Sequence, residues 1–336
     1  MNILITGGAG FLGARLARAL LKAGTLSLRG AAARPIQQIV LADRGAPPAD
    51  LMADARVRSV QGDLLELVQR HELPIPGTDV VFHLAAAVSA ECEADFELGM
   101  RSNLDTTRAL LDACRALGTC PVFVFASSLA VFGRQPGQPP LGPMRDDTLP
   151  TPQGSYGIQK YIGEQLVADF TRKGFVAGRS VRPMTVSVRP GLPNGAASGF
   201  LSGMIREPLA GVRARVPVGP EVPVALASPT RTIEGFVRAA QVDDAQWGQR
   251  TAINLPSLRT TVGEMAAALE KVAGKEGGAL LDWQPDPAIE KLVRSWPGDV
   301  AWERARGLGL RSDESFEAIV REYIAENPQA VRLAPR

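Results

Sequence analysis

The sequence predicts an α/β protein built on a doubly wound parallel sheet, with a smaller lobe in its C-terminal part. Two observations predict this class. Short apolar runs, each about as long as one strand, alternate with segments of helical periodicity through the N-terminal half, and such alternation is typical of parallel sheets covered by helices. A glycine-rich turn also joins the first predicted strand to the first predicted helix.

The predicted elements can be placed along the chain in order. Strands are expected over residues 3–6, 38–42, 57–60, 80–84, 122–126 and 181–189. Helices are expected over residues 12–23, from residue 64, and over residues 95–117, 155–172, 264–273 and 315–326. Proline and glycine make residues 134–152 a surface loop. The near-continuous apolar run at 122–126 fits a strand that is buried on both faces.

Composition argues against several classes of function. The chain has 336 residues, enough for one large α/β domain with an appendage or for two domains. A net charge of +2 gives no basis for binding nucleic acid or an anionic membrane. No apolar run approaches the ~20 residues of a membrane span, and no signal peptide is visible, so a cytoplasmic protein is expected. Three cysteines without CxxC spacing and two histidines form no metal-binding pattern, and no metal is expected.

Residues 2–13, NILITGGAGFLG, form the motif on which the other assignments depend. Gly7, Gly10 and Gly13 follow a buried strand and open a helix. Gly7 allows a sharp turn, Gly10 leaves room for a phosphate against the main chain, and Gly13 lets the helix lie close to the strand. The first N–H groups of the helix and its dipole would face the anion. The motif predicts the pyrophosphate site of a Rossmann-type fold; the alternative is a glycine turn needed only for packing.

Asp43 ends the second long strand, where the adenosine ribose hydroxyls of NAD are bound in such sheets. Its carboxylate would repel a 2′-phosphate, which favours NAD over NADP. The separation from Gly13 is 30 residues (43 minus 13) instead of about 20, because a loop over 25–35 lengthens the connection. Two alternatives stay open: Arg44 could accept a 2′-phosphate, and Asp43 could be an ordinary loop acid.

Two later segments are also expected to line the cofactor. Asp63 is placed to meet the adenine amino group, and it can also cap the helix that begins at Leu64. Small residues after the strand at 80–84 let the backbone pass under the cofactor, whereas His83 is interpreted as a packed core histidine. The expected cofactor-binding residues are Gly7, Gly10, Phe11, Leu12, Gly13, Asp43, Asp63, Leu64, Leu84, Ala85, Ala86, Tyr156 and Lys160.

Tyr156 and Lys160 are four residues apart on one predicted helix, which places both side chains on the same face with Cβ atoms about 5–6 Å apart. A free tyrosine titrates near ~10 and is not a base at neutral pH. The Lys160 ammonium is expected to lower the tyrosine pKa by favouring the phenolate. Ser128, at the end of the strand at 122–126, can hydrogen-bond the substrate oxygen. The alternative for the pair is a solvated helix face, against which the glycine turn, Asp43 and Ser128 argue.

This combination resembles the extended short-chain dehydrogenase/reductase family, which includes nucleotide-sugar epimerases and dehydratases. TGGAGFLG, residues 6–13, is similar to the family's TGGxGxxG, and SSLAVFG, residues 127–133, to its SSxxVYG. The resemblance covers roughly residues 1–240. It implies that Ser128 is the catalytic serine, Tyr156 the general acid/base and Lys160 the ribose-binding lysine. RSNLDTTRALLDACR, residues 101–115, resembles the segment whose asparagine, here Asn103, completes the active site.

Departures from the nucleotide-sugar members narrow the substrate. Residues 182–194 and 228–239 match poorly the RYFNVYG-like and RDYIHVDD-like segments of those members. VRPGLPN, 188–194, and SGMIREPLAG, 202–211, are most similar to family members that oxidise C2 of a four-carbon sugar acid with NAD. A carboxylate substrate favours a bidentate guanidinium, although a structural ion pair is the alternative for Arg189. The resemblance implies a small sugar-acid substrate bound by Ser89, Ser128, Tyr156, Thr185, Arg189 and Asn194.

Three functions are compatible with these patterns. The first is an NAD-dependent dehydrogenase of a small sugar acid, and the second is a nucleotide-sugar 4-epimerase or dehydratase, or a uronate dehydrogenase, of the same family. The third, an NAD(P)-sensing binding protein, is disfavoured by the intact Ser128, Tyr156 and Lys160. Residues 1–180 are expected to form the NAD-binding domain with the catalytic residues, and residues 181–330 mainly a substrate-binding lobe. The resemblance also allows a homodimer through the helices that hold Asn103 and Tyr156.

Overall fold

The computed structural model describes residues 1–135, 137–139, 142–191, 198–248 and 250–333, and its central element is a parallel sheet. Within these residues the sheet has seven strands, in the spatial order β12-β8-β7-β6-β1-β4-β5, and all neighbouring pairs are parallel. The strands are β1 (Asn2–Thr6), β4 (Gln38–Asp43), β5 (Val57–Gln61), β6 (Val80–His83), β7 (Val122–Ala126), β8 (Ala177–Arg182) and β12 (Ile253–Asn254). This arrangement confirms the predicted doubly wound α/β class.

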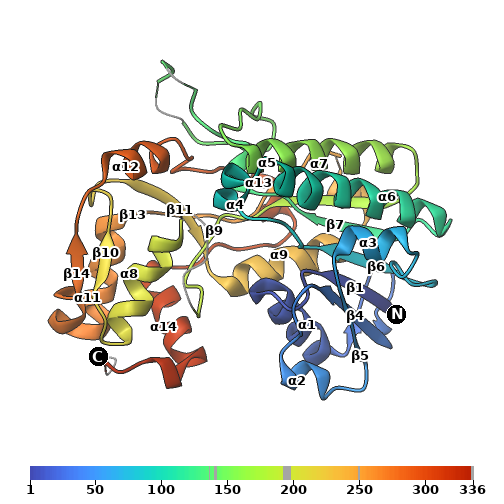
Figure 1. Ribbon diagram of the computed structural model, residues 1–336, viewed down its shortest axis with the longest axis horizontal. Coiled ribbons are helices and arrows are strands. Elements are labelled where there is room, and N and C mark those ends of the chain that lie inside the picture. Colours follow the sequence, from blue (N-terminus) through green and yellow to red (C-terminus); the bar gives the residue numbers. More distant parts are fainter. Residues whose placement is uncertain (136, 140–141, 192–197, 249, 334–336) are drawn as a thin grey trace.

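Helices cover both faces of this sheet (Figure 1). α1, α9 and α13 contribute to the core on one face, and α3, α6 and α7 to the core on the other. Successive strand residues point to opposite faces, so Ile3 and Ile5 join the first core and Leu4 joins the second. The helices of this part are α1 (Phe11–Ala23), α2 (Ala49–Met52), α3 (Leu64–Gln69), α4 (Ser89–Ala94), α5 (Phe96–Gly99), α6 (Thr106–Ala116), α7 (Ser155–Arg172), α9 (Pro229–Gln241), α10 (Asp244–Trp247) and α13 (Glu303–Gly307), with a 3-10 turn η2 (Leu129–Val131).

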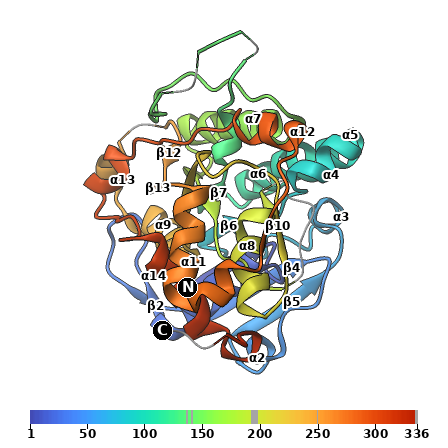
Figure 2. The same ribbon diagram turned by 90° about the vertical axis from the view of Figure 1, so that its left-hand side faces the viewer.

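A second group of elements packs around its own hydrophobic core and lies beside the sheet (Figure 1); Figure 2 shows it from the front. It contains a two-stranded sheet, β10-β14, and a three-stranded sheet, β13-β11-β9. Its elements are β9 (Thr185–Val186), α8 (Gly199–Leu209), β10 (Ala214–Val216), β11 (Pro223–Ala227), β13 (Leu258–Thr261), α11 (Val262–Gly278), β14 (Leu281–Trp283), α12 (Pro287–Val293), α14 (Phe316–Glu326) and the 3-10 turn η3 (Pro328–Ala330). Because α9 and β12 return to the large sheet, the two parts interleave along the chain, and the division at residue 180 stays a prediction.

Three of the predicted helices are present: α1 and α7 have nearly the expected bounds, whereas α11 extends beyond the predicted 264–273 at both ends. α1 ends at Gly24, which adopts the left-handed conformation (φ 67°) and donates its N–H to Leu20 O. α7 spans Ser155–Arg172, as the periodicity predicts. α11 begins after Thr261, whose side chain and that of Glu264 form a reciprocal capping box. Among the described residues, no helix is both long enough and apolar enough to cross a membrane.

Three segments differ from the prediction. The strand expected over 181–189 stops at Arg182 and resumes in another sheet as β9, because Pro183 has no N–H to donate to the ladder. The helix expected over 95–117 is divided into α5, a π-helical turn η1 (Met100–Asp105) and α6, and the wider π turn changes which side chains face inward. The segment expected to be a loop at 25–35 carries a short antiparallel pair, β2 (Thr25–Leu26) with β3 (Arg34–Pro35).

Candidate active site

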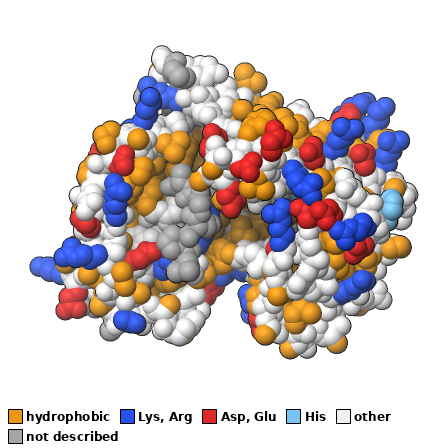
Figure 3. All heavy atoms as spheres, in the orientation of Figure 1, with side chains coloured by type: hydrophobic (Ala, Val, Ile, Leu, Met, Phe, Trp, Pro, Cys, Tyr) orange, Lys and Arg blue, Asp and Glu red, His pale blue; other side chains and the backbone are white. Residues whose placement is uncertain are grey.

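A cavity of about 530 Å³ opens at the carboxyl ends of β1, β4, β5 and β6, where parallel sheets of this order bind their ligands. Figure 3 shows the molecule hollowed between the large sheet and the second group of elements. Every residue predicted to bind the cofactor lines this cavity. The sequence-based set is therefore brought together in one place, although its segments are spread from residue 7 to residue 160.

The glycine turn fits a phosphate-binding loop. Gly7 has a φ of +72°, and a Cβ atom on Gly13 would lie 2.1 Å from Gly7 O, so the close approach of α1 to the turn requires glycine. A Cβ atom on Gly10 would meet Gly7 O at 3.2 Å, and outside the neighbouring residues and the helix itself no other described atom would lie within 4 Å of it. The first turn of α1 holds no acidic residue and its N-cap, Gly10, supplies no side-chain cap. The helix donors are thus left for an anion, as the pyrophosphate of a dinucleotide requires.

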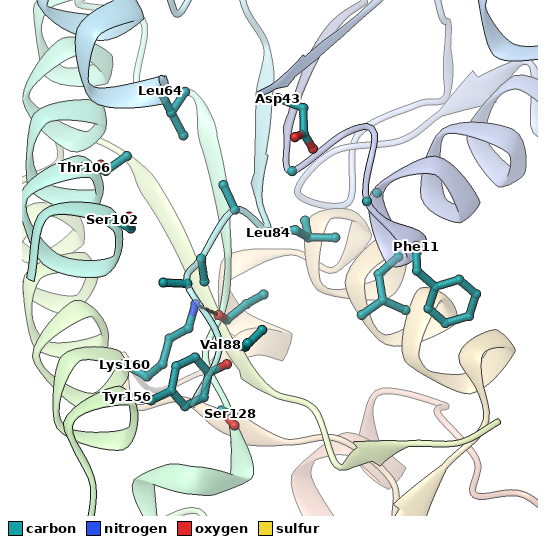
Figure 4. Close-up of a pocket in the computed structure, with 18 of the residues that line it drawn as sticks. Phe11, Asp43, Leu64, Leu84, Val88, Ser102, Thr106, Ser128, Tyr156 and Lys160 are labelled. Atoms are coloured by element: carbon teal, nitrogen blue, oxygen red, sulfur yellow. Dashed lines mark hydrogen bonds between the residues drawn. The ribbon is translucent and has the colours of Figure 1, made fainter. Parts of the chain in front are cut away.

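Asp43 braces the glycine turn from the end of β4. Its carboxylate accepts the N–H of Ala9 at 3.0 Å and the N–H of Gly45 at 3.1 Å. Its side chain lies at the cavity, near the glycine turn (Figure 4). Asp43 is therefore both an organising loop acid and a cavity residue, and the two interpretations made from the sequence are compatible.

Asp63 caps α3 and also holds two guanidinium groups. Its Oδ1 accepts the N–H of Glu66 at 3.3 Å, which confirms the capping role. Arg44 donates to Asp63 Oδ2 at 2.8 Å, and Arg101 donates to Oδ1 at 3.0 Å. Burial acts to raise the pKa of Asp63, but the bonds from Arg44 and Glu66 and the charge of Arg101 hold it below its ordinary value.

Tyr156 and Lys160 point from α7 into the cavity beside Ser128, which follows β7 (Figure 4). Ser128 lies close enough to Tyr156 for its hydroxyl group to act on the tyrosine pKa. Lys160 Nζ donates to Ala126 O at 2.9 Å and lies 5.7 Å from the centroid of the Tyr156 ring. A phenol, an ammonium and an alcohol thus meet at one point, a set suited to moving a proton on and off a substrate hydroxyl.

Close packing fixes α7 against the segment that carries Ser128. A Cβ atom on Gly157 would lie 2.1 Å from Ala130 O, so the residue after Tyr156 can only be glycine at this separation. The buried Glu164 joins the same two elements, because it accepts a hydrogen bond from Ser127 Oγ at 2.5 Å and pairs with Arg182 at 2.7 Å. Gly157 and Glu164 were not predicted as site residues, although the YG pair and the helical spacing of Tyr156, Lys160 and Glu164 were visible in the sequence.

Burial dominates the pKa values of the catalytic pair. Burial raises the pKa of Tyr156, against the opposing effects of the Ser128 hydroxyl group and of the charge on Arg189. The expectation that the lysine brings the tyrosine pKa below its ordinary value is therefore not met in the protein alone. Burial lowers the pKa of Lys160 to about 8. The lysine remains protonated at neutral pH, so its charge is available to stabilise a phenolate.

Two polar residues lie behind the cavity wall. Asn103, on η1, is 2% exposed, accepts the N–H of Ala87 at 2.8 Å and donates to Gln159 at 2.8 Å. It is absent from the described lining of the cavity and connects the backbone under the cofactor site to α7. His83 is fully buried between the hydroxyls of Thr6 (2.7 Å) and Thr107 (2.9 Å), and burial lowers its pKa to about 3. These contacts support the interpretation of His83 as a core residue.

A smaller cavity of about 150 Å³ adjoins the first, and the two share the residues Ser128, Tyr156 and Arg189. Ser89 and Thr185 also line it, whereas Asn194 lies outside the described residues. Arg189 donates Nε to Val186 O at 3.2 Å, and among the described residues no carboxylate forms an ion pair with it. Burial lowers the pKa of this guanidinium, because a cation with little access to solvent is less well stabilised. Its position between the cavities suits it to bind an anionic ligand group.

The far wall of the smaller cavity was not predicted from the sequence. It consists of Pro223, Val224 and Ala225 on β11 together with Trp296 and Pro297 after α12. These residues lie at least 95 positions after Ser128 in the chain (223 minus 128) and carry no motif, so only the tertiary packing brings them to the site. Within the described part of the chain, no group of three or more histidine, cysteine, aspartate or glutamate side chains is placed to hold a metal ion.

The fold and the glycine turn are typical of dinucleotide-binding α/β proteins, and Tyr156, Lys160 and Ser128 lie together in the same cavity. The model of the NAD dependent epimerase/dehydratase family matches residues 3–224, and the chain belongs to this family. D-erythronate dehydrogenase of Cupriavidus necator is 48% identical to the chain over 97% of the chain and 98% of its own length. D-erythronate dehydrogenase of Haemophilus influenzae is 38% identical over 96% and 99%.

Solved structures agree with the fold. A structure described as the nucleoside-diphosphate-sugar epimerase from Agrobacterium tumefaciens superposes with a TM-score of 0.86 and 38% identity, over 98% of this chain and 95% of that one. L-threonine 3-dehydrogenase from Trypanosoma brucei superposes with a TM-score of 0.80 and 22% identity, over 99% and 98%, which shows the shared fold. The chain is an enzyme of an NAD-dependent oxidoreductase family, and the two relatives from Cupriavidus necator and Haemophilus influenzae are named dehydrogenases.

Proposed function

We propose that this enzyme oxidises the C2 hydroxyl group of D-erythronate to the 2-oxo acid, with NAD as the hydride acceptor. The observation that carries the proposal is the shared lining of the two cavities by Ser128, Tyr156 and Arg189. The smaller cavity, which would bind the anionic group, thus opens onto the larger cavity, which would bind the dinucleotide. The two meet at Ser128 and Tyr156, the residues suited to acid/base chemistry. Similarity to D-erythronate dehydrogenases over nearly the full chain supports this choice of substrate.

The size and charge of the smaller cavity favour a short acid. Its volume of about 150 Å³ is well below the roughly 300–1,000 Å³ of sites for drug-sized ligands. Arg189 lies close enough to Tyr156 for its charge to act on the tyrosine pKa. A carboxylate bound by Arg189 would therefore bring the next carbon, C2, to Tyr156. The C3 and C4 hydroxyls would extend toward Ser89 and Thr185, which line the same cavity.

The proposed proton transfer uses three side chains. Tyr156, as phenolate, accepts the proton of the C2 hydroxyl, and Ser128 hydrogen-bonds the same oxygen. The electron pair of the O–H bond then forms the C=O bond as the hydrogen on C2 departs with its own pair. NAD, when bound, supplies the acceptor for that hydride. Lys160 would stabilise the phenolate by its positive charge. The charge of Arg189 also opposes the effect of burial on the Tyr156 pKa.

The cofactor would lie along the larger cavity. We assign the pyrophosphate to the glycine turn and the start of α1, and the adenosine ribose hydroxyls to Asp43. Tyr156 and Lys160 line the same cavity and would face the nicotinamide end. Asn103 is assigned a positioning role, because its side chain contacts Ala87, Gln159 and Cys92 and does not belong to the described cavity lining.

A nucleotide-sugar epimerase is the second candidate, because the structure described as a nucleoside-diphosphate-sugar epimerase from Agrobacterium tumefaciens is 38% identical to this chain. A panel of D-erythronate, its stereoisomers, longer aldonates and two UDP-hexoses, each with NAD or NADP, separates the candidates. We expect sustained NADH formation, followed by absorbance, with D-erythronate and NAD. Interconversion of the UDP-hexoses without net NADH would identify an epimerase. Binding of NAD without turnover of any compound would identify a sensor and contradict the proposal.

A further inference from the structure

An ion-pair group lies at the adenosine end of the larger cavity. Its centre is the Asp63 carboxylate, which is 20% exposed and binds Arg44 at 2.8 Å and Arg101 at 3.0 Å. Arg101 also approaches Glu66 at 3.4 Å. Arg44 and Asp63 line the cavity together with Asp43, the residue that would meet the ribose hydroxyls.

The Arg44 guanidinium lies where it could favour the binding of NADP over NAD. It directly follows Asp43, and a free guanidinium beside the 2′ position of the adenosine ribose would attract a 2′-phosphate. Asp43 accepts hydrogen bonds from the N–H groups of Ala9 and Gly45, and among the described residues it forms no ion pair with Arg44. The group that holds the Arg44 guanidinium is Asp63, from the next strand along the sheet.

We propose that Asp63 is a specificity-determining residue, which favours NAD over NADP by holding Arg44 and Arg101 away from the 2′-phosphate position. The inference rests on the proposed NAD site. Asp43 would repel the phosphate directly, whereas Asp63 acts through the arginines by occupying their donors and neutralising their charge. Asp63 thus combines three tasks at one point: it caps α3, it lines the adenosine end of the cavity and it removes a phosphate-binding cation from that end.

Substitution of Asp63 by asparagine separates these tasks. Asparagine is as good an N-cap as aspartate, so Asp63→Asn keeps the start of α3 but removes the carboxylate charge. The measurement is the dissociation constant of NAD and of NADP by isothermal titration calorimetry, which requires no substrate. We expect the ratio of the NADP constant to the NAD constant to fall about five- to tenfold in Asp63→Asn, the range expected for partly exposed charge pairs. Addition of Arg44→Ala to this variant should cancel most of the gain.

Asp50→Asn is the matched control, because it removes the same charge from an exposed pair with Arg18 outside the cavity lining and should leave the ratio unchanged. A wild-type ratio near one, an unchanged ratio in Asp63→Asn, or a gain that survives Arg44→Ala would each overturn the inference. In the last two cases, tight NAD binding by the wild type would leave the proposed cofactor site intact. Failure of the wild type to bind either dinucleotide would instead overturn the proposed function.

Discussion

The side of the cleft that we assign to the dinucleotide is built from the carboxyl ends of parallel strands, whereas the side that we assign to the substrate is built from loops and short strands of distant segments. On the first side, the turn after β1 is fixed by backbone contacts that exclude any side chain on Gly13. On the second, Thr185 on β9, Val224 on β11 and Trp296 after α12 meet around a small cavity. Tyr156 lies at the junction and lines both cavities.

This difference suggests how the two sides tolerate change. A wall made of backbone has few alternative conformations, so a substitution there is expected to abolish dinucleotide binding. A wall made of side chains can be reshaped, so a substitution there is expected to change which substrate is preferred. Ser128 and Tyr156 at the junction serve both sides, and their loss should stop the reaction without removing either ligand. The following predictions are ordered from the largest expected effect to the smallest.

Tyr156→Phe tests the junction. The change removes the proposed base and keeps the ring, so we expect kcat for D-erythronate oxidation to fall about 10²–10⁴-fold. NAD should bind within a few-fold of its wild-type affinity, as measured by calorimetry. A variant that keeps most of its turnover would remove Tyr156 from the chemistry.

Gly13→Ala tests the backbone wall. Its Cβ atom would lie 2.1 Å from Gly7 O, so the glycine turn must shift, and we expect NAD affinity to fall at least about 100-fold. Gly307→Ala is the control, because no described atom lies within 4 Å of its Cβ position. Equal affinities for NAD in the two variants would show that the turn is not the phosphate site.

Arg189→Ala tests the anion site on the substrate side. We expect kcat/KM for D-erythronate to fall about 30- to 100-fold, because a charge-assisted bidentate contact is lost. Arg189→Lys should recover only part of this loss, since an ammonium cannot bind a carboxylate in two parallel bonds. Arg215→Ala, which removes an exposed pair with Asp286 in the same part of the molecule, should have little effect. An unchanged KM in Arg189→Ala would favour a purely structural role for the guanidinium.

The burial of His83 in the core of the sheet should make the free energy of unfolding depend on pH. Its pKa is about 3 in the folded protein and about 6.5 in the unfolded chain, so the unfolded state binds the proton first as the pH falls. The free energy of unfolding should therefore decrease below about pH 6.5, by about 2 kcal/mol between pH 7 and pH 5. Urea unfolding at both pH values measures it. His83→Gln should lack most of this decrease and His71→Gln should retain it; identical slopes in all three proteins would be inconsistent with a buried neutral histidine.

Trp296→Ala tests the side-chain wall and should have the smallest effect. Removal of the ring enlarges the far end of the substrate cavity, so we expect kcat/KM for five-carbon aldonates to rise about tenfold relative to D-erythronate. Trp283→Ala is the control, since Trp283 is 38% exposed and does not belong to the described cavity lining. No change in relative preference would mean that other residues limit the chain length.

The same difference explains how much could be predicted from the sequence. Gly7, Gly10 and Gly13 stand in one short motif, and their spacing encodes the backbone geometry directly. Tyr156 and Lys160 are four residues apart on a helix whose bounds were predicted correctly. Pro223 and Trp296 carry no local signal, because their position depends on the packing of two small sheets and α12. The π-helical turn that buries Asn103 and the burial that raises the Tyr156 pKa are tertiary effects, and periodicity does not contain them.

A crystal structure of the protein with NAD and D-erythronate would test the central claim most directly. The account predicts that the substrate carboxylate binds Arg189 and that the C2 hydroxyl oxygen lies about 3 Å from both Tyr156 Oη and Ser128 Oγ. A different hydroxyl at Tyr156, or a carboxylate bound elsewhere, would contradict it.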